Sequence, residues 1–191
     1  MKFTAIIVAL ALAASCSGNK TEVKEEQKKE DPTAVVGKEP THDERIAIIK
    51  AYEDTMRAAS RLDPRIGKAV ITAYMDFVKV YFQDTLCADY TFKAAEIADN
   101  MDSPDKAIEL YKEVYNSYTK FPYRPEALFR IANIYELKLN DYANAKLYYN
   151  DVITYFPKSP LADGAKAALK NMGKTDTELI REFEKKNGVK K

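Results

Sequence analysis

The chain has 191 residues, of which 30 are Lys or Arg and 29 are Asp or Glu, so its formal net charge at pH 7 is +1. This balance excludes the cationic excess with which proteins bind nucleic acid. The sequence has one histidine, His42, and contains no zinc-binding set, phosphate-binding glycine loop or nucleophile elbow. We therefore expect no catalytic activity, no metal and no cofactor.

Residues 3–14 form an almost unbroken apolar run. The run is shorter than the roughly 20 residues needed to cross a membrane, and it is typical of a secretory signal peptide over residues 1–15. The small residues at positions 12–15, in the order Leu-Ala-Ala-Ser, resemble a bacterial lipobox. This resemblance implies a lipidated, palmitate-bearing Cys16 and, because Ser17 is not acidic, an anchor in the outer membrane. An ordinary cleaved signal peptide is the alternative.

Residues 16–40 contain almost no large apolar side chain, so they cannot bury enough surface to offset the ordering of their backbone. We expect a disordered, charged tether. The Lys-Glu-Glu run at residues 24–26 weakly resembles the acidic signals that send lipoproteins to the cell surface, but it lies further from Cys16 than those signals do. We therefore favour the periplasmic face of the outer membrane. With Cys16 lipidated, Cys87 has no disulfide partner in the chain, and we expect it to be a buried thiol.

Residues 41–191 have helical periodicity throughout and carry no strand signal. Thr41 with Glu44 and Thr175 with Glu178 predict capping boxes. Asp63-Pro64 and Ser103-Pro104 each predict an N-cap followed by proline at the first helical position. The connecting loops are only a few residues long, so consecutive helices must be antiparallel neighbours. The predicted fold class is all-α, with about eight helices in stacked hairpins. We expect these helices over residues 41–60, 64–81, 86–100, 105–119, 125–139, 141–155, 160–172 and 175–187.

The helical unit is repeated along the chain, because similar segments begin at Phe82, Phe121 and Phe156. One hairpin cannot bury its own apolar face, so a repeat of this length indicates a stacked array. The hairpin over 125–155 resembles the tetratricopeptide repeat. The matching residues are Leu128, Ile131, Ala132, Tyr135, Ala145, Tyr149 and Pro157. The resemblance implies a short right-handed solenoid. Its repeats are expected at about 62–86, 87–122, 124–157 and 159–172, followed by a polar capping helix at 175–187.

In the family that this hairpin resembles, the first helix of each hairpin lines an inner groove that holds a protein or peptide. The resemblance thus implies partner contacts at Asp89, Phe92, Lys93, Glu96, Glu126, Phe129, Arg130, Asn133 and Glu136. Two aromatic rings among charges of both signs are compatible with capture of an extended peptide. For each residue an ordinary solvated helix face is the alternative, and Phe92 and Phe129 can equally pack between hairpins.

The segment over 155–163 is also similar to the hairpin junctions of envelope tetratricopeptide proteins. These include the periplasmic partner of the Tol system and the lipoprotein subunit of the outer-membrane barrel-assembly machine. The resemblance implies a noncatalytic, lipid-anchored scaffold or adaptor that binds a protein or peptide in the bacterial cell envelope. A self-associating structural module, an envelope hydrolase or a glycan-binding protein are the alternatives. A hydrolase is disfavoured because His42 is expected at the mobile edge of the tether.

Overall fold

The computed structural model describes residues 38–188, and Glu39–Lys191 form one compact unit. The predicted signal peptide, the lipidation site at Cys16 and nearly all of the predicted tether lie outside the described residues. In the described range, no helix combines the length and the apolar composition that a membrane span requires.

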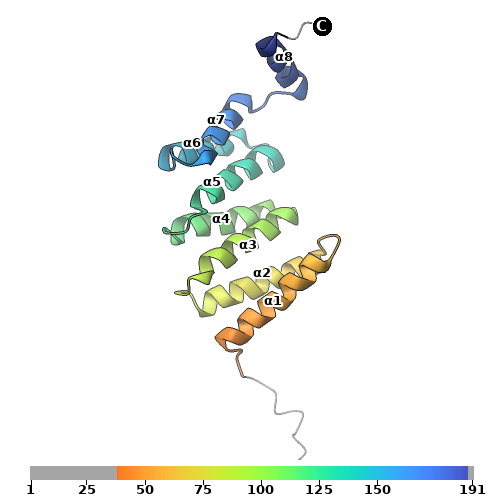
Figure 1. Cartoon of the computed structure of the whole chain (residues 1–191), viewed down its shortest axis with the longest axis vertical. Coiled ribbons are helices and arrows are strands. Elements are labelled where there is room, and N and C mark those ends of the chain that lie inside the picture. The colour runs from red at the N-terminus through yellow and green to blue at the C-terminus, as the bar shows by residue number, and fades with distance from the viewer. Residues whose placement is uncertain (1–37, 189–191) are drawn as a thin grey trace, which may run out of the picture. The chain divides into compact units, whose positions relative to one another are not determined.

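The compact unit consists of helices joined by short turns, and no strand occurs between residues 38 and 188. Figure 1 shows α1 to α7 stacked in chain order, and from α1 to α7 each helix packs against the next. This arrangement confirms the predicted all-α solenoid of antiparallel hairpins. The helices are α1 (His42–Ala58), α2 (Pro64–Val80), α3 (Leu86–Asn100), α4 (Pro104–Ser117), α5 (Arg124–Asn133), the π-helix η1 (Ile134–Lys138), α6 (Tyr142–Tyr155), α7 (Pro160–Asn171) and α8 (Asp176–Asn187).

The helix ends follow most of the capping signals in the sequence. Both predicted capping boxes form, because the side chains of Thr41 and Thr175 each accept a hydrogen bond from the backbone of a glutamate three residues on. Asp63 caps α2 by accepting from the Arg65 backbone at 2.8 Å. Ser103 lies at the N-cap of α4 with Pro104 as the first helical residue, as expected, but its side chain makes no capping bond. Its backbone (φ −114°, ψ 70°) lies outside the extended region typical of N-cap residues.

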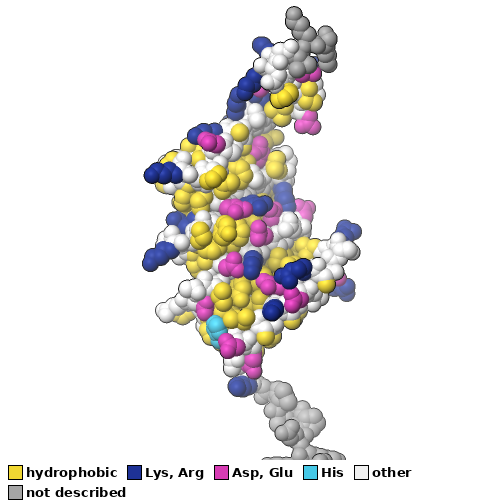
Figure 2. Space-filling model, in the orientation of Figure 1, with side chains coloured by type: hydrophobic (Ala, Val, Ile, Leu, Met, Phe, Trp, Pro, Cys, Tyr) yellow, Lys and Arg dark blue, Asp and Glu magenta, His cyan; other side chains and the backbone are white. Residues whose placement is uncertain are grey.

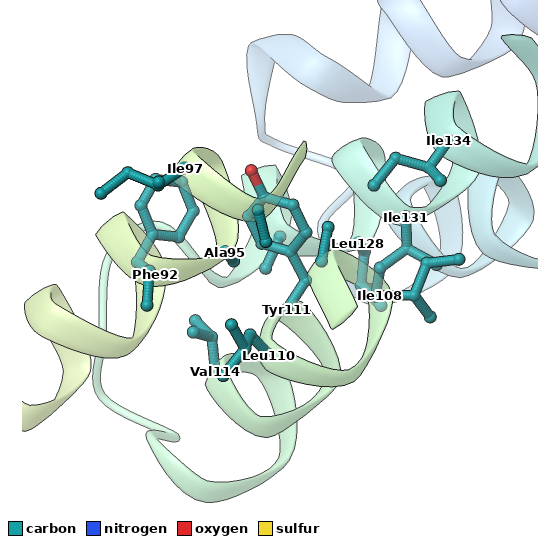
Figure 3. Close-up of a cluster of buried hydrophobic side chains, with 14 of the residues drawn as sticks. Phe92, Ala95, Ile97, Ile108, Leu110, Tyr111, Val114, Leu128, Ile131 and Ile134 are labelled. Carbon is teal, nitrogen blue, oxygen red and sulfur yellow. The ribbon is translucent and has the colours of Figure 1, made fainter. Parts of the chain in front are cut away.

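The core combines small residues, which let neighbouring helices approach, with large side chains that fill the space between hairpins. Tyr74, Tyr111 and Tyr149 occupy equivalent positions on α2, α4 and α6 and are at most 1% exposed. Figure 3 shows Tyr111 among apolar side chains of α3, α4 and α5. Burial of each large apolar side chain contributes roughly 1.5–3 kcal/mol. These three tyrosines are therefore core residues. Buried alanines lie at Ala95, Ala98, Ala107, Ala132 and Ala145.

The third hairpin has one extra residue between the buried alanine of its first helix and the buried tyrosine of its second helix: Ala132 and Tyr149 are 17 positions apart, whereas Ala95 and Tyr111 are 16 apart. A continuous helix was expected over 125–139, but its last turn is the π-helix η1, in which the Leu139 amide donates to the Ile134 carbonyl at 3.1 Å. A π-turn absorbs an extra residue without breaking the helix. Tyr149 is therefore buried at the same place in its helix as Tyr111. These two tyrosines are 38 positions apart in the sequence, whereas Tyr74 and Tyr111 are 37 apart.

The last helix does not seal the stack, so the expectation that it forms a polar cap over the core is wrong. No residue of α8 is buried, and Ile180 and Phe183 are 57% and 66% exposed. Gly173 adopts a left-handed conformation (φ 74°) at the turn before α8. The Lys174 ammonium pairs with Glu182 at 2.7 Å, so the connection is bound to α8 itself.

His42 is an ordered part of the first helix, and the expectation that it lies in a mobile segment is wrong. Its Nε2 lies 2.9 Å from Asp84 Oδ2, and its ring contacts the rings of Phe77 and Tyr81. The imidazole therefore joins the start of α1 to the turn between α2 and α3. Cys87 is fully buried, as expected, and its thiol donates to the Tyr81 carbonyl, while burial raises its pKa.

Candidate partner-binding face

The first helices of the three hairpins present charged and polar side chains together. Figure 2 shows acidic and basic side chains lying side by side over α1 and α3. The electrostatic neighbours of Glu96 on α3 include Lys93 of its own helix and Arg130 of α5, so the charged residues of successive hairpins interact. We call this surface the first-helix face and define it by Glu53, Asp89, Lys93, Glu96, Glu126, Arg130, Asn133 and Glu136.

The cationic side chains of this face are held by carboxylates of the same face. Lys93 Nζ lies 2.9 Å from Asp89 Oδ2 and 3.3 Å from Glu53 Oε1, which joins α3 to α1. Arg130 pairs with Glu126 one turn earlier on α5, at 3.1 Å. Both cations are about 40% exposed, so they contact solvent while their positions are fixed. The predicted residues Asp89, Lys93, Glu126 and Arg130 thus form an ordered polar surface.

Two buried tyrosines on the second helices of their hairpins, Tyr74 of α2 and Tyr149 of α6, form hydrogen bonds to residues of the first-helix face. The Tyr74 hydroxyl donates to Glu53 at 2.6 Å. The Tyr149 hydroxyl lies 2.6 Å from Asn133 Oδ1 and 2.7 Å from Glu136 Oε2. Burial and the Glu136 carboxylate both raise the pKa of Tyr149. Two of the predicted contact residues, Asn133 and Glu136, are therefore anchored to the scaffold by a buried hydroxyl.

Tyr111 differs from its two counterparts. Its ring is fully buried, and its hydroxyl is buried with no hydrogen-bond partner among the described residues. Figure 3 shows this hydroxyl pointing away from Leu110 and Val114. Burial raises the pKa of Tyr111, and the charged groups that act on its hydroxyl all belong to α3 and α5. The unbonded hydroxyl therefore lies beneath the first-helix face. Those charged groups are Arg130, Glu96, Asp99 and Glu126.

The two predicted aromatic contacts are part of the scaffold. Phe92 is 6% exposed, and its ring lies 5.5 Å from the ring of Tyr111 and 5.6 Å from that of Tyr123. Phe129 is half-buried and packs edge-on against Tyr149, with ring centroids 5.5 Å apart. Phe92 therefore lies in the core and not on the binding surface, which is the packing alternative that the sequence left open.

Glu96 has no ion pair and no hydrogen bond among residues 38–188, which sets it apart from the other charged side chains of the face. It is half-buried, and burial raises the pKa of its carboxyl group. It lines a cleft of about 430 Å³ between α1 and α3, together with Glu53, Met56, Tyr74 and Ile97. The structure thus brings the predicted Lys93 and Glu96 together with Glu53, which the sequence did not identify.

Metal-binding geometry is not found on this face, since no group of three His, Cys, Asp or Glu side chains between residues 38 and 188 is placed to hold a metal ion. The family model described as tetratricopeptide repeat matches residues 126–159, which contain most of α5 and all of η1 and α6. No curated protein matches the chain. The third hairpin therefore matches the tetratricopeptide repeat, a unit that generally mediates protein–protein interaction and is generally noncatalytic.

Proposed function

We propose that the protein is a noncatalytic adaptor that binds a protein or peptide partner along the first-helix face. The tetratricopeptide match at residues 126–159 is the observation that carries this proposal. The ion pairs of Lys93 and Arg130 and the hydrogen bonds of Tyr149 support it, because they fix the side chains before a partner arrives. Side chains that are already ordered lose less conformational entropy on binding.

We also propose that the adaptor is anchored in the outer membrane by lipid on Cys16, facing the periplasm, and serves a partner in the bacterial cell envelope. The lipobox-like residues 12–15 and the charged segment 16–40 support this location. A lipid anchor and a tether restrict the search for a partner to the neighbourhood of the membrane. A Cys16→Ala variant should leave the membrane fraction. Retention equal to that of the parent would contradict the anchor.

Photocrosslinking in cells tests the binding face. Benzoylphenylalanine at Arg130, on the first-helix face, should capture one or a few discrete proteins, which mass spectrometry identifies. The matched control places the same group at Lys146, an exposed residue of α6. Crosslinks from Arg130 that are no richer than those from Lys146 would count against the first-helix face as the binding surface.

Self-association is a second candidate function, favoured by the exposed apolar residues Ile180 and Phe183 of α8. If α8 pairs with a second copy of the chain, the molar mass of residues 39–191 in light scattering should rise with concentration. A Phe183→Ser variant should then remain a monomer. A parent protein whose mass stays monomeric at every concentration would remove this candidate.

A further inference from the structure

The carboxylates around Glu96 outnumber the cations, and every cation there already has a carboxylate partner. Lys93 pairs with Asp89 and Glu53, and Arg130 pairs with Glu126. Lys138 of η1 pairs with Asp99 at 2.9 Å and Arg57 of α1 with Asp54 at 2.9 Å. Glu96 therefore remains as a half-buried carboxylate with no ion pair or hydrogen bond among the described residues, although Lys93 and Arg130 are its electrostatic neighbours. A ligand carboxylate would be repelled here, whereas a ligand cation would be attracted.

The shape of the cleft beside Glu96 indicates what kind of cation fits. Met56, Ile97 and the ring of Tyr74 give it apolar walls, and the carboxylates of Glu53 and Glu96 lie at its polar part. The cations Arg57 and Lys93 also line it, and both are paired with carboxylates, Arg57 with Asp54 and Lys93 with Asp89 and Glu53. Lysine and arginine side chains combine a long aliphatic stem with a cationic end, and they pack the stem against apolar surface while the charge remains at a polar site. A small inorganic cation would leave the apolar walls uncovered.

We propose, on the basis of the proposed function, that Glu96 binds a lysine or arginine side chain of the partner, with its stem in the cleft between α1 and α3. The Glu96 carboxylate accepts hydrogen bonds from the ammonium or guanidinium group. The partner segment thus carries a basic residue at the position that crosses α3. This assigns to the binding face a specificity for basic segments.

A random peptide library displayed on phage, selected against the full chain in mild detergent, tests this assignment. Selected peptides should share one Lys or Arg at a fixed position. Replacing that Lys by norleucine, or that Arg by citrulline, should weaken binding to the parent protein about tenfold, as expected for loss of one charge-assisted hydrogen bond. Glu96→Gln should weaken binding of the unmodified peptide by a similar factor and abolish the further effect of norleucine or citrulline.

Glu109→Gln is the matched control, because it removes the same charge from an exposed position of α4. It should bind every peptide as the parent does, and circular dichroism should show equal helicity for both variants. Selected peptides without a fixed cation, or a norleucine effect that persists in Glu96→Gln, would overturn the cation site and leave the adaptor function standing. Failure to select any peptide that binds specifically would overturn both.

Discussion

The second and third hairpins share one scaffold but differ in the polar groups that surround it. Tyr111 on α4 and Tyr149 on α6 are both fully or almost fully buried at equivalent positions. The hydroxyl of Tyr149 is bonded to Asn133 and Glu136, whereas that of Tyr111 is unbonded among the described residues. The repeat therefore fixes where the rings lie, while the residues above them are free to differ from one hairpin to the next.

The cause of this difference lies in a contact between the two hairpins. Asp99 takes the position in the second hairpin that Glu136 takes in the third, but its carboxylate pairs with Lys138 of η1 at 2.9 Å. The Lys138 ammonium also donates to the Asp99 backbone carbonyl. The Asp99 carboxylate oxygen of this ion pair, like the Tyr111 hydroxyl, is buried and has no hydrogen-bond partner among the described residues. We infer that the ion pair with Lys138 holds the Asp99 carboxylate where it does not accept from Tyr111.

The largest expected effect tests whether the two hairpins are one scaffold. Leu110→Ala in the second hairpin and Leu128→Ala in the third should each lower the free energy of unfolding by about 2–5 kcal/mol, because both side chains are at most 1% exposed. Urea unfolding of residues 39–191, followed by circular dichroism, measures this. Leu147→Ala, at a 62% exposed position, is the control and should cost less than about 0.5 kcal/mol. Losses confined to one hairpin would show that the other is not part of the cooperative core.

The tyrosine pair gives the next largest effect and tests the difference directly. Tyr149→Phe should lower the free energy of unfolding by about 1–2 kcal/mol, because it removes a buried hydrogen bond to Asn133 and Glu136. Tyr111→Phe should change it by less than about 0.5 kcal/mol, or stabilise the protein, because it removes a hydroxyl that has no partner. Equal losses in the two variants would mean that the Tyr111 hydroxyl is bonded in solution.

The fold was largely predictable from the sequence because its signals are local. Capping boxes at Thr41 and Thr175 and a proline at the start of α2 specify helix ends within a few residues, and these ends are found in the structure. The π-helix η1 was not predictable in this way. A helix that must accommodate one extra residue can loop it out, shift register or form a π-turn, and packing of the finished hairpin decides among these.

The candidate site was less predictable than the fold because it depends on contacts between helices. The periodicity of α8 shows an apolar stripe, but it does not show whether anything covers Ile180 and Phe183. The pairing of Lys93 with Glu53 joins residues 40 positions apart, so no local pattern reveals it. The sequence did contain a signal that the surroundings of Tyr111 differ from those of Tyr149. When the first helices of the second and third hairpins are aligned, the acid Glu96 takes the place of the amide Asn133.

A double-mutant cycle sharpens the account of why Tyr111 is unbonded. Lys138→Met should cost about 1 kcal/mol, because the ion pair with Asp99 is partly exposed. In this background the Asp99 carboxylate is released and can accept from Tyr111, so Tyr111→Phe should become destabilising by about 1 kcal/mol. Urea unfolding of the four proteins in the cycle gives the coupling energy. Additive effects would show that Lys138 does not control the Tyr111 hydroxyl.

The smallest expected effect concerns another contact between hairpins, in which His42 of α1 joins the turn before α3. Hydrogen bonds to Asp43 and Asp84 raise the pKa of His42 above its usual 6.5. A group whose folded-state pKa is raised stabilises the protein fully below its unfolded pKa, and the stabilisation disappears as the pH rises through the folded value. The bond to Asp84 should therefore contribute more to stability at about pH 6 than at about pH 9.

Asp84→Asn tests this contact, because an asparagine side chain can still accept from the Leu86 backbone while it removes the charge opposite His42. The difference in unfolding free energy between the parent and this variant should shrink as the pH rises from about 6 to about 9. Proton NMR of the single histidine should show that its pKa falls in the variant. A difference that stays constant over this range would mean that the imidazole is held by its contacts with Phe77 and Tyr81 and not by charge.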